Sequence, residues 1–397
     1  MAGGRGGRLP PPRSRLPSLR LLLRLLCLTL CRAMDYQAYS GLGLSTPFEA
    51  KARTKFDSGM ENPNREPGYA NKARMSQAAW ALLEKAAYPL PPASRPRPGV
   101  RTGTLKTFSG WTESRVYPGT NRTWWYYVPA AHDGRSPANL VVFLDGSGFM
   151  DTGGNFRATV VLDNLIADGL LPPTVAVFVN PGFRPGHPDC AYSDQDPTIE
   201  VGDDPQRSLE YDTLSERFAR FLLEDILPIV EGAYNISQDP RSRAVIGISS
   251  SAVGAFCSAW FRPDRFGLVA THVGSFVNIR EAHHLPWLIR NTPRKQIRVS
   301  LQSGERDMDN NHGSWALGNR EMAAALAYAG YEHRLDFGPG SHYASARGGS
   351  RLPGTLVWLL GGGDPERCAP CRAEPGGLPS RLARAVLWLC SPTGTAA

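Results

Sequence analysis

The chain has 397 residues, of which 42% are hydrophobic and 20% are charged, a length that allows one large α/β core with extensions. Its formal net charge is +8, but residues 1–33 hold seven arginines and no lysine or acid, so 8 − 7 leaves about +1 for the remainder. The chain has no basic helix interleaved with aromatic residues and no run of roughly 18 apolar residues. We therefore expect no nucleic-acid partner and no membrane span.

The first 33 residues have the features of a targeting segment. They begin with several arginines, continue with a short apolar centre over 25–31, and end in Cys31-Arg32-Ala33, which fits a small-x-small cleavage site. This pattern predicts a signal peptide and a product that is secreted or in the secretory pathway. An organelle transit peptide is the alternative, because the segment is rich in arginine and free of acids.

Residues 34–105 are predicted to form an N-terminal extension. The segment is polar and interrupted, with one helix-like stretch over 75–87 and a proline-rich run over 89–98. A run of this composition favours an extended conformation and predicts a linker. The part before it is interpreted as a pro-region or as a strap packed on the following domain.

A continuous apolar run over 140–144 predicts a strand that is buried on both faces. It ends in an Asp-Gly-Ser-Gly loop. In an acyl-transfer enzyme such a loop supplies one hydrogen-bond donor to the oxyanion, and the residue after the nucleophile supplies another. The candidate donors are the amides of Gly146 or Ser147 together with that of Ser250. A strand-to-helix turn without a ligand is the alternative.

Arg207 and Glu210 precede a helix-like stretch over 214–230, in which apolar residues recur at helical spacing. One interpretation is an Arg–Glu pair that caps this helix. The other is a substrate contact, because a bidentate arginine suits a carboxylate or a catecholate. Three tryptophans are candidates for an aromatic-lined substrate site, with buried core anchors as the alternative. They are Trp260, Trp287 and Trp315.

Ser249 lies where an apolar strand-like stretch passes through small residues into a helix-like one. This arrangement is typical of a nucleophile elbow, which exposes a serine hydroxyl at the carboxyl end of a sheet. Only small residues fit beside the strained turn, so the usual motif is G-x-S-x-G. Here Ser251 stands in place of the second glycine and the motif is G-x-S-x-S. A serine-rich turn without a catalytic role is the alternative.

A catalytic serine needs a base and an acid, and in α/β-hydrolases the acid and then the histidine follow it along the chain. Two later strand-like runs enter loops, the first with Asp307 and the second with His342. We predict that His342 is the base and Asp307 the acid that orients it. The alternatives are Glu305 or Asp309 as the acid, a turn or cap role for Asp307, and a solvated loop position for His342.

Short blocks along the chain also match a known family in their order. They include Tyr126-Tyr127-Val128-Pro129, Phe143-Leu144-Asp145-Gly146, Arg207-Ser208-Leu209-Glu210-Tyr211, Gly247-Ile248-Ser249-Ser250, Val273-Gly274-Ser275-Phe276 and Gly338-Pro339-Gly340-Ser341-His342. Together, residues 111–360 resemble the esterase D and enterochelin esterase-like branch of the α/β-hydrolases. By this resemblance Ser249, Asp307 and His342 match the nucleophile, the acid and the base. Ser251 and Ala252 depart from it, because the family normally has glycines there.

The resemblance implies a serine carboxylic-ester hydrolase that acts through an acyl-enzyme. It implies an α/β-hydrolase fold, with a mostly parallel central sheet and helices on both faces. We expect the catalytic domain over 106–362 and a peripheral tail over 363–397. The alternatives are a catalytically silent hydrolase fold used for binding, and a feruloyl or acetyl esterase of carbohydrates.

The expected partner is a small-molecule or carbohydrate-linked ester, and the sequence does not predict an oligomeric state. In siderophore-esterase relatives a similar arginine and glutamate lie near the substrate, which implies the same for Arg207 and Glu210. Neither a phosphate-binding glycine loop nor a helical His-Glu metal motif is found, so we expect no cofactor and no metal.

The cysteines outside the first segment give three further expectations. Cys257, on the helix predicted after Ser249, is expected to be a buried thiol. Cys368 and Cys371 have the C-x-x-C spacing of a redox or metal pair, and a disulfide with Cys390 is the alternative.

Overall fold

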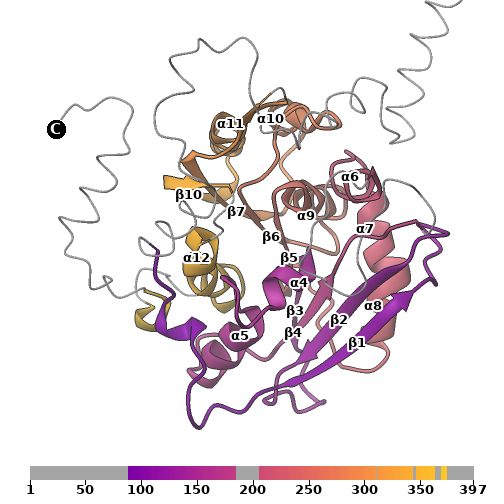
Figure 1. The fold of residues 1–397 in the computed structure, drawn as a ribbon, viewed down its shortest axis with the longest axis vertical. Helices are drawn as coiled ribbons and strands as arrows, with labels where there is room; N and C mark the ends of the chain where they lie inside the picture. The colour runs from indigo at the N-terminus through magenta and orange to yellow at the C-terminus, as the bar shows by residue number, and fades with distance from the viewer. Residues whose placement is uncertain (1–87, 185–204, 311, 343–345, 363–367, 373–397) are drawn as a thin grey trace, which may run out of the picture. The chain divides into compact units, whose positions relative to one another are not determined.

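The computed structural model describes residues 88–184, 205–310, 312–342, 346–362 and 368–372 (Figure 1). The predicted leader, the predicted helix over 75–87 and Cys390 lie outside the described residues. Within the described ranges, no helix is long and apolar enough to cross a membrane.

The core of the fold is an eight-stranded sheet in the order β1-β2-β4-β3-β5-β6-β7-β10 (Figure 1). The strands β3 to β7 and β10 run parallel to one another, while β1 and β2 are antiparallel to their neighbours. The predicted mostly parallel sheet is therefore confirmed. The strands are β1 (Thr104–Trp111), β2 (Arg122–Val128), β3 (Asn139–Leu144), β4 (Thr174–Val179), β5 (Arg243–Ile248), β6 (Leu268–His272), β7 (Arg298–Arg306) and β10 (Glu332–Ser341).

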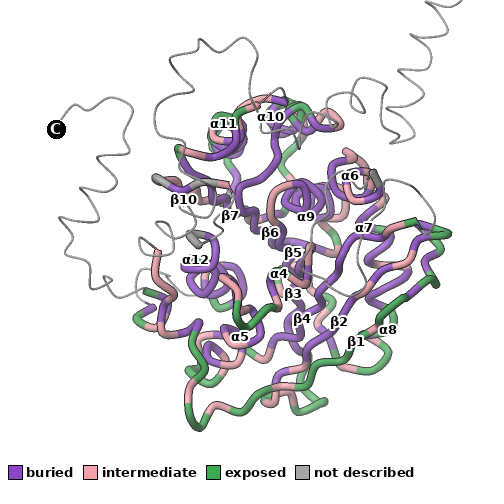
Figure 2. Tube along the Cα trace, in the orientation of Figure 1, coloured by how far each residue is buried: buried purple, intermediate pink, exposed green. Residues whose placement is uncertain are grey.

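Burial differs between the centre and the edge of the sheet (Figure 2). Every residue of β3 and β4 is buried, which explains why their sequences are continuous apolar runs. In β1, at the edge, only Trp111 is buried. Apolar patterning was therefore a good predictor at the centre of the sheet and a weak one at this edge.

Helices cover both faces of the sheet (Figure 1). The predicted helix over 214–230 is a helical stretch with a π-helical segment, Leu222–Ile226, between α7 and α8. The helices are α4 (Gly146–Met150), α5 (Ala158–Ala167), α6 (Pro205–Tyr211), α7 (Arg217–Phe221), α8 (Leu227–Glu231), α9 (Ser250–Phe261), α10 (Leu285–Asn291), α11 (Trp315–Tyr328) and α12 (Ala346–Leu356). A short hairpin of β8 (Asp309–Asn310) and β9 (Gly313–Ser314) lies between β7 and α11.

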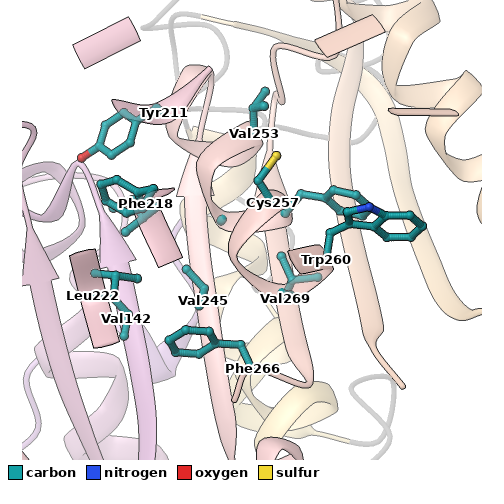
Figure 3. Close-up of a cluster of buried hydrophobic side chains, with 14 of the residues drawn as sticks. Val142, Tyr211, Phe218, Leu222, Val245, Val253, Cys257, Trp260, Phe266 and Val269 are labelled. Atoms are coloured by element: carbon teal, nitrogen blue, oxygen red, sulfur yellow. The ribbon is translucent and has the colours of Figure 1, made fainter. Parts of the chain in front are cut away.

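Alternate side chains of the central strands enter two separate cores. Val142 and Val245 join the core beneath α6 to α11, whereas Val141 and Ala244 join the core beneath α5 and α12. Figure 3 shows the first core where α9 lies beside the strands. Cys257 of α9 is a free buried thiol in this core, as predicted, and burial raises its pKa well above the usual value.

The proline-rich segment lies against the second core. Its 3-10 turn, Pro92–Ser94, buries Ala93, and the side chain of Asn164 on α5 donates to the carbonyls of Ala93 and Arg95, both at 2.8 Å. Arg97 forms an ion pair with Asp168 at 2.8 Å. This part of the extension is thus packed on the domain, while the predicted boundaries at 105 and 362 stay predictions.

Cys368 and Cys371 form a disulfide with each other, with their Cα atoms 5.2 Å apart. Both are buried in the second core, beside the turn formed by Pro92–Ser94. This pairing corrects the alternative of a disulfide from either of them to Cys390. A spacing of three residues lets the two sulfurs meet within one turn of chain, so no distant partner is needed.

Candidate active site

Ser249 lies at the junction of β5 and α9 in a strained conformation, with φ 58° and ψ −123°. Such a conformation is costly for a residue other than glycine and is typical of nucleophile elbows. Gly247 makes the turn possible, because a Cβ atom there would lie 2.1 Å from the carbonyl oxygen of Ser251. The backbone amide of Ser249 donates to the carbonyl of His272 on the neighbouring strand at 2.9 Å.

The departure from the usual elbow motif has a direct structural account. The side chain of Ser251 is buried, and its hydroxyl accepts from the amide of Ile248 at 2.8 Å. The same hydroxyl donates to the carbonyl of Ile248 at 2.7 Å. Ser251 therefore satisfies both backbone polar groups of the residue before Ser249, and the elbow keeps its shape with a serine in place of the second glycine.

Asp307 follows the end of β7, where its side chain is buried. Its carboxylate accepts from the hydroxyl of Ser303 at 2.6 Å and from the backbone amide of Met308 at 2.9 Å. The rival acids Glu305 and Asp309 are both exposed. Of the three candidates, Asp307 is thus the one held in a fixed orientation inside the molecule.

His342 follows β10 and joins the other two predicted residues. Its Nδ1 lies 2.7 Å from Oδ1 of Asp307, and its Nε2 lies 2.9 Å from Oγ of Ser249. A carboxylate can only accept, so Nδ1 carries the proton of the neutral ring and Nε2 accepts from the serine hydroxyl. The structure therefore brings together Ser249, His342 and Asp307 in the order that proton transfer from a serine requires.

The sheet register explains this meeting. Strands β7 and β10 are parallel neighbours, and their last residues, Arg306 and Ser341, pair with each other. Asp307 and His342 are therefore the first residues after the two strands. The two strands approach closely at Gly304, where a Cβ atom would lie 2.1 Å from the carbonyl oxygen of Gly340. Ser249 follows β5, which lies two strands from β7 in the same parallel part of the sheet. All three residues thus leave the sheet at its carboxyl edge.

The predicted oxyanion loop is the start of α4. Gly146 is buried, and a Cβ atom there would lie 2.4 Å from the backbone nitrogen of Val179, so β4 leaves room only for glycine. The amide of Ser147 donates to Oδ1 of Asn180 at 3.0 Å, which engages that donor within the protein. Of the two alternatives in this loop, Gly146 is therefore the better candidate. The other predicted donor, Ser250, is the buried first residue of α9.

Arg207 lies within α6 and forms a bidentate ion pair with Asp145, at 3.1 and 2.6 Å. Asp145 adopts a left-handed conformation with φ 57° directly before Gly146. Arg207 is partly exposed and pairs with Asp145, while Glu210 pairs with Arg122, so the alternative of an Arg–Glu cap is wrong. The guanidinium instead holds the residue that precedes the candidate oxyanion donor.

Glu210 is part of a closed structural network. Its fully buried carboxylate pairs with Arg122 through contacts of 2.9 and 2.8 Å. It also accepts from the side chain of Gln206 at 2.8 Å and the amide of Gly182 at 3.2 Å. Four donors use the acceptor capacity of one carboxylate. The expected substrate contact of Glu210 is corrected for this reason.

Trp315 is fully buried at the start of α11. The expectation that it lines a substrate site is therefore corrected. Its ring lies edge-on to His342, with the ring centroids 5.9 Å apart. Its Nε1 donates to the hydroxyl of Ser275 at 3.0 Å. Trp260 is also buried, as the core alternative predicted, whereas 63% of Trp287 is exposed.

Ser275 is the site residue that the sequence reasoning missed. Its hydroxyl lies 3.3 Å from Oγ of Ser249, and its backbone amide donates to the carbonyl of Ser249 at 3.1 Å. The only signal in the sequence was its place in the block Val273-Gly274-Ser275-Phe276. Among the described residues, no group of three or more histidines, cysteines and acids is placed to hold a metal ion.

Comparison with known proteins now adds the family. A family model described as "Putative esterase" matches residues 116–351, which is more than half of the chain. The chain belongs to this esterase family. The predicted resemblance to esterases is thereby confirmed, and the matched residues of the esterase domain include all three members of the Ser249–His342–Asp307 site.

Curated and solved relatives of this esterase domain agree with the family. The iron(III) enterobactin esterase of Dickeya dadantii (strain 3937) is 24% identical over 318 residues, which cover 74% of this chain and 61% of the relative. The enterobactin esterase of Shigella flexneri, crystallised in the presence of enterobactin, has a TM-score of 0.52. It is 21% identical and the match covers 68% of this chain and 62% of that one. The same enzyme in the presence of 2,3-dihydroxy-N-benzoyl-serine has a TM-score of 0.51. The structural likeness shows the shared fold, and this chain spans about three fifths of the length of these relatives.

Proposed function

We propose that the protein is a serine carboxylic-ester hydrolase that works through an acyl-enzyme. The observation that carries this proposal is the continuous contact from Asp307 through His342 to the hydroxyl of Ser249, at 2.7 and 2.9 Å. Family membership supports the same reaction class.

The geometry supports a two-step reaction. As Oγ of Ser249 attacks the ester carbonyl, its proton passes to Nε2 of His342, and the imidazolium is stabilised by the carboxylate of Asp307. The proton then passes to the leaving alcohol as the ester bond breaks. In the second step water attacks the acyl-enzyme with His342 as the base, the acid leaves, and Oγ of Ser249 regains a proton.

The developing oxyanion needs donors beside the serine. Gly146 and Ser250 are the first residues of α4 and α9, and both helices start at the carboxyl edge of the sheet. Their backbone amides are the candidate donors. Backbone amides at the start of a helix are suited to a negative charge. Arg207 acts one step further out, because its ion pair holds Asp145 in the conformation that presents Gly146.

For the substrate we propose a small-molecule ester with an aromatic acyl group. The support is the relatives, whose names and bound compounds are enterobactin and a dihydroxybenzoyl-serine. Because the chain is shorter than these relatives, the test set includes simple esters as well. The alternative of a silent binding fold was suggested by the altered elbow, and the two hydrogen bonds of Ser251 favour an elbow that keeps its shape.

The test is hydrolysis of p-nitrophenyl acetate, of 2,3-dihydroxybenzoyl-serine methyl ester and of methyl ferulate by the full chain and by Ser249→Ala. We expect turnover by the full chain and a loss of about 10⁴- to 10⁶-fold in kcat for the variant, because the nucleophile is absent. Ser258→Ala is the matched control, since this buried hydroxyl donates to the carbonyl of Gly254 within the same helix at 2.7 Å.

A fluorophosphonate probe identifies the nucleophile independently of the substrate. Oγ of Ser249 forms a bond to phosphorus, fluoride leaves, and the serine proton passes to His342. We expect mass spectrometry to locate the label on Ser249. No turnover of any ester and no label on the folded chain would overturn the proposal.

A further inference from the structure

Ser275 is held rigidly against the candidate nucleophile. It lies in the loop after β6 with its side chain fully buried. Its own amide donates to the carbonyl of Ser249 at 3.1 Å, and the side chain of Asn319 on α11 donates to the carbonyl of Gly274 at 2.8 Å. The loop begins with Val273 at φ 43°, a conformation that a β-branched residue adopts only under constraint. The position of the Ser275 hydroxyl is therefore set by its surroundings.

The hydrogen positions around Ser275 follow from the groups present. An indole N–H can only donate, so Oγ of Ser275 accepts from Nε1 of Trp315 at 3.0 Å. The hydroxyl hydrogen of Ser275 then remains available for Oγ of Ser249 at 3.3 Å. Oγ of Ser249 donates its hydrogen bond to Nε2 of His342, so it can act towards Ser275 only as an acceptor. All hydrogen bonds then run in one direction, from Trp315 to Asp307.

We propose that Ser275 is a second catalytic hydroxyl, which donates to the nucleophilic oxygen of Ser249 during the reaction, and that Trp315 is the residue that positions it. The inference rests on the proposed esterase function and deepens it. It adds a donor at the attacking oxygen to the two backbone donors assigned to the carbonyl oxygen.

The proposed hydrogen bond acts in both steps of the reaction. During acylation, negative charge builds on Oγ of Ser249 as its proton moves to His342, and a donor at that oxygen stabilises the charge. In deacylation the same oxygen is the leaving group and carries charge again before it is reprotonated. A separation of 3.3 Å is long for two hydroxyl groups, and we expect it to shorten as the charge develops.

The expected effect is a fall in kcat with little change in KM. Loss of a hydrogen bond to a charged group corresponds to a fall of about 10- to 100-fold in kcat for Ser275→Ala. KM should change less than about threefold, since the lost bond is strongest in the transition state. A purely structural role would instead lower the thermal midpoint and leave the kcat of the folded protein unchanged.

The test measures the second-order rate constant of fluorophosphonate labelling at Ser249, because this reaction needs no ester substrate. Labelling by Ser275→Ala should be slower than by the full chain by the same 10- to 100-fold factor expected for kcat. Ser275→Cys keeps a weak donor and should recover part of the rate. Ser258→Ala, which removes a buried hydroxyl that donates to a carbonyl of its own helix, should label at the rate of the full chain.

A double-mutant cycle tests the role of Trp315. Trp315→Phe keeps a ring beside His342 but removes the N–H, so we expect a fall of about threefold in the labelling rate. In Ser275→Ala/Trp315→Phe the second change should add nothing, because Trp315 acts through Ser275.

The outcomes separate this inference from the proposed function. If the full chain labels at Ser249 and Ser275→Ala labels equally fast, the inference is wrong and the esterase proposal stands. Additive effects in the double variant would overturn the role of Trp315 as a positioning residue. If the full chain neither labels nor hydrolyses esters, the proposed function fails and this inference fails with it.

Discussion

Two buried polar networks in this protein use similar groups for different ends. One joins Asp307, His342 and Ser249 at the carboxyl edge of the sheet, and Ser249 is partly exposed. The other joins Arg122 and Glu210, whose side chains have no exposed surface. In the first network the hydrogen bonds pass through Oγ of Ser249, an atom that can still react. In the second, all acceptor positions of the carboxylate are occupied by the protein itself.

The two networks also differ in backbone strain. The serine network also contains strained backbone, with φ 58° at Ser249 and 43° at Val273. Strain of this kind persists where the surrounding structure enforces it and is typical of functional sites. A buried ion pair whose carboxylate is fully hydrogen-bonded contributes to one stable fold, whereas the serine network keeps a nucleophile aligned. Changes in the first should therefore alter activity, and changes in the second should alter stability.

The first prediction concerns Asp307, whose substitution should alter activity and leave stability nearly unchanged. In Asp307→Asn the amide no longer fixes the proton of His342 on Nδ1, so Nε2 is protonated and cannot take the serine proton. We expect kcat to fall by about 10³- to 10⁴-fold with little change in the thermal midpoint, by analogy with such changes in other serine hydrolases. Ester hydrolysis and thermal unfolding, measured on the same samples, check both parts.

The two rival acids are the matched controls for Asp307. Glu305 near the end of β7 and Asp309 at the start of β8 are exposed and lie two residues on either side of Asp307. Glu305→Gln and Asp309→Asn should keep kcat within about twofold, because surface changes away from the site have small effects. A dead Asp309→Asn beside an active Asp307→Asn would mean that the acid has been assigned to the wrong residue.

The next effect concerns the closed network. Glu210→Gln leaves the guanidinium of Arg122 buried without its counter-charge, and it should lower the free energy of unfolding by about 3–5 kcal/mol. The activity of the protein that remains folded should be close to normal. Urea unfolding followed by tryptophan fluorescence measures the loss.

A surface ion pair supplies the control for Glu210. Arg220 and Glu224 pair at 2.7 Å with both side chains almost half exposed. Glu224→Gln should leave stability nearly unchanged, because exposed ion pairs contribute little. Equal destabilisation by both variants would contradict the distinction between the buried and the exposed pair.

His272 belongs to neither network and adds a dependence on pH. It is buried at the end of β6, and desolvation lowers its pKa from 6.5 to about 4, against the opposing hydrogen bond to Gln302 and the charge of Asp336. The folded state therefore favours the neutral ring, and stability falls as the pH drops from 6.5 towards 4. A pKa difference of this size corresponds to about 3 kcal/mol.

The measurement is the free energy of unfolding as a function of pH in the wild type and in His272→Gln. Over this pH range the wild type should lose about 3 kcal/mol more than the variant. The comparison uses the slopes, so a constant destabilisation by the substitution does not affect it. Parallel slopes would show that His272 binds its proton equally in the folded and the unfolded state, and would contradict the lowered pKa.

Much of the fold and of the site was predictable because it follows from strand ends. The runs before Ser249, Asp307 and His342 are apolar or alternating, and residues that follow parallel strands collect at one edge of the sheet. The same reasoning did not separate Asp307 from its neighbours, because the register of β7 with β10 decides which acid meets the histidine. The catalytic roles of Ser249, Asp307 and His342 stay predictions.

Tertiary partners were not predictable from local sequence. Arg207 and Glu210 lie three residues apart, yet their ionic partners are Asp145 and Arg122, far away in the chain. Local reasoning left open whether the two pair with each other or contact a substrate. Likewise, Ser275 gains its importance from contacts with α11 and the elbow, which no short-range pattern encodes.

The smallest expected effect concerns Ser251, where the sequence departs from the usual elbow motif. Ser251→Gly restores the glycine but removes the hydroxyl that bonds the amide and carbonyl of Ile248. We expect the free energy of unfolding to fall by about 1–2 kcal/mol and kcat to stay within about threefold. Ser251→Ala keeps the Cβ atom and separates the loss of the hydroxyl from the cost of a glycine in the helix. If Ser251→Gly raised kcat by more than about tenfold, the serine would be limiting the elbow, and the distinction between groups that stabilise and groups that react would fail at this position.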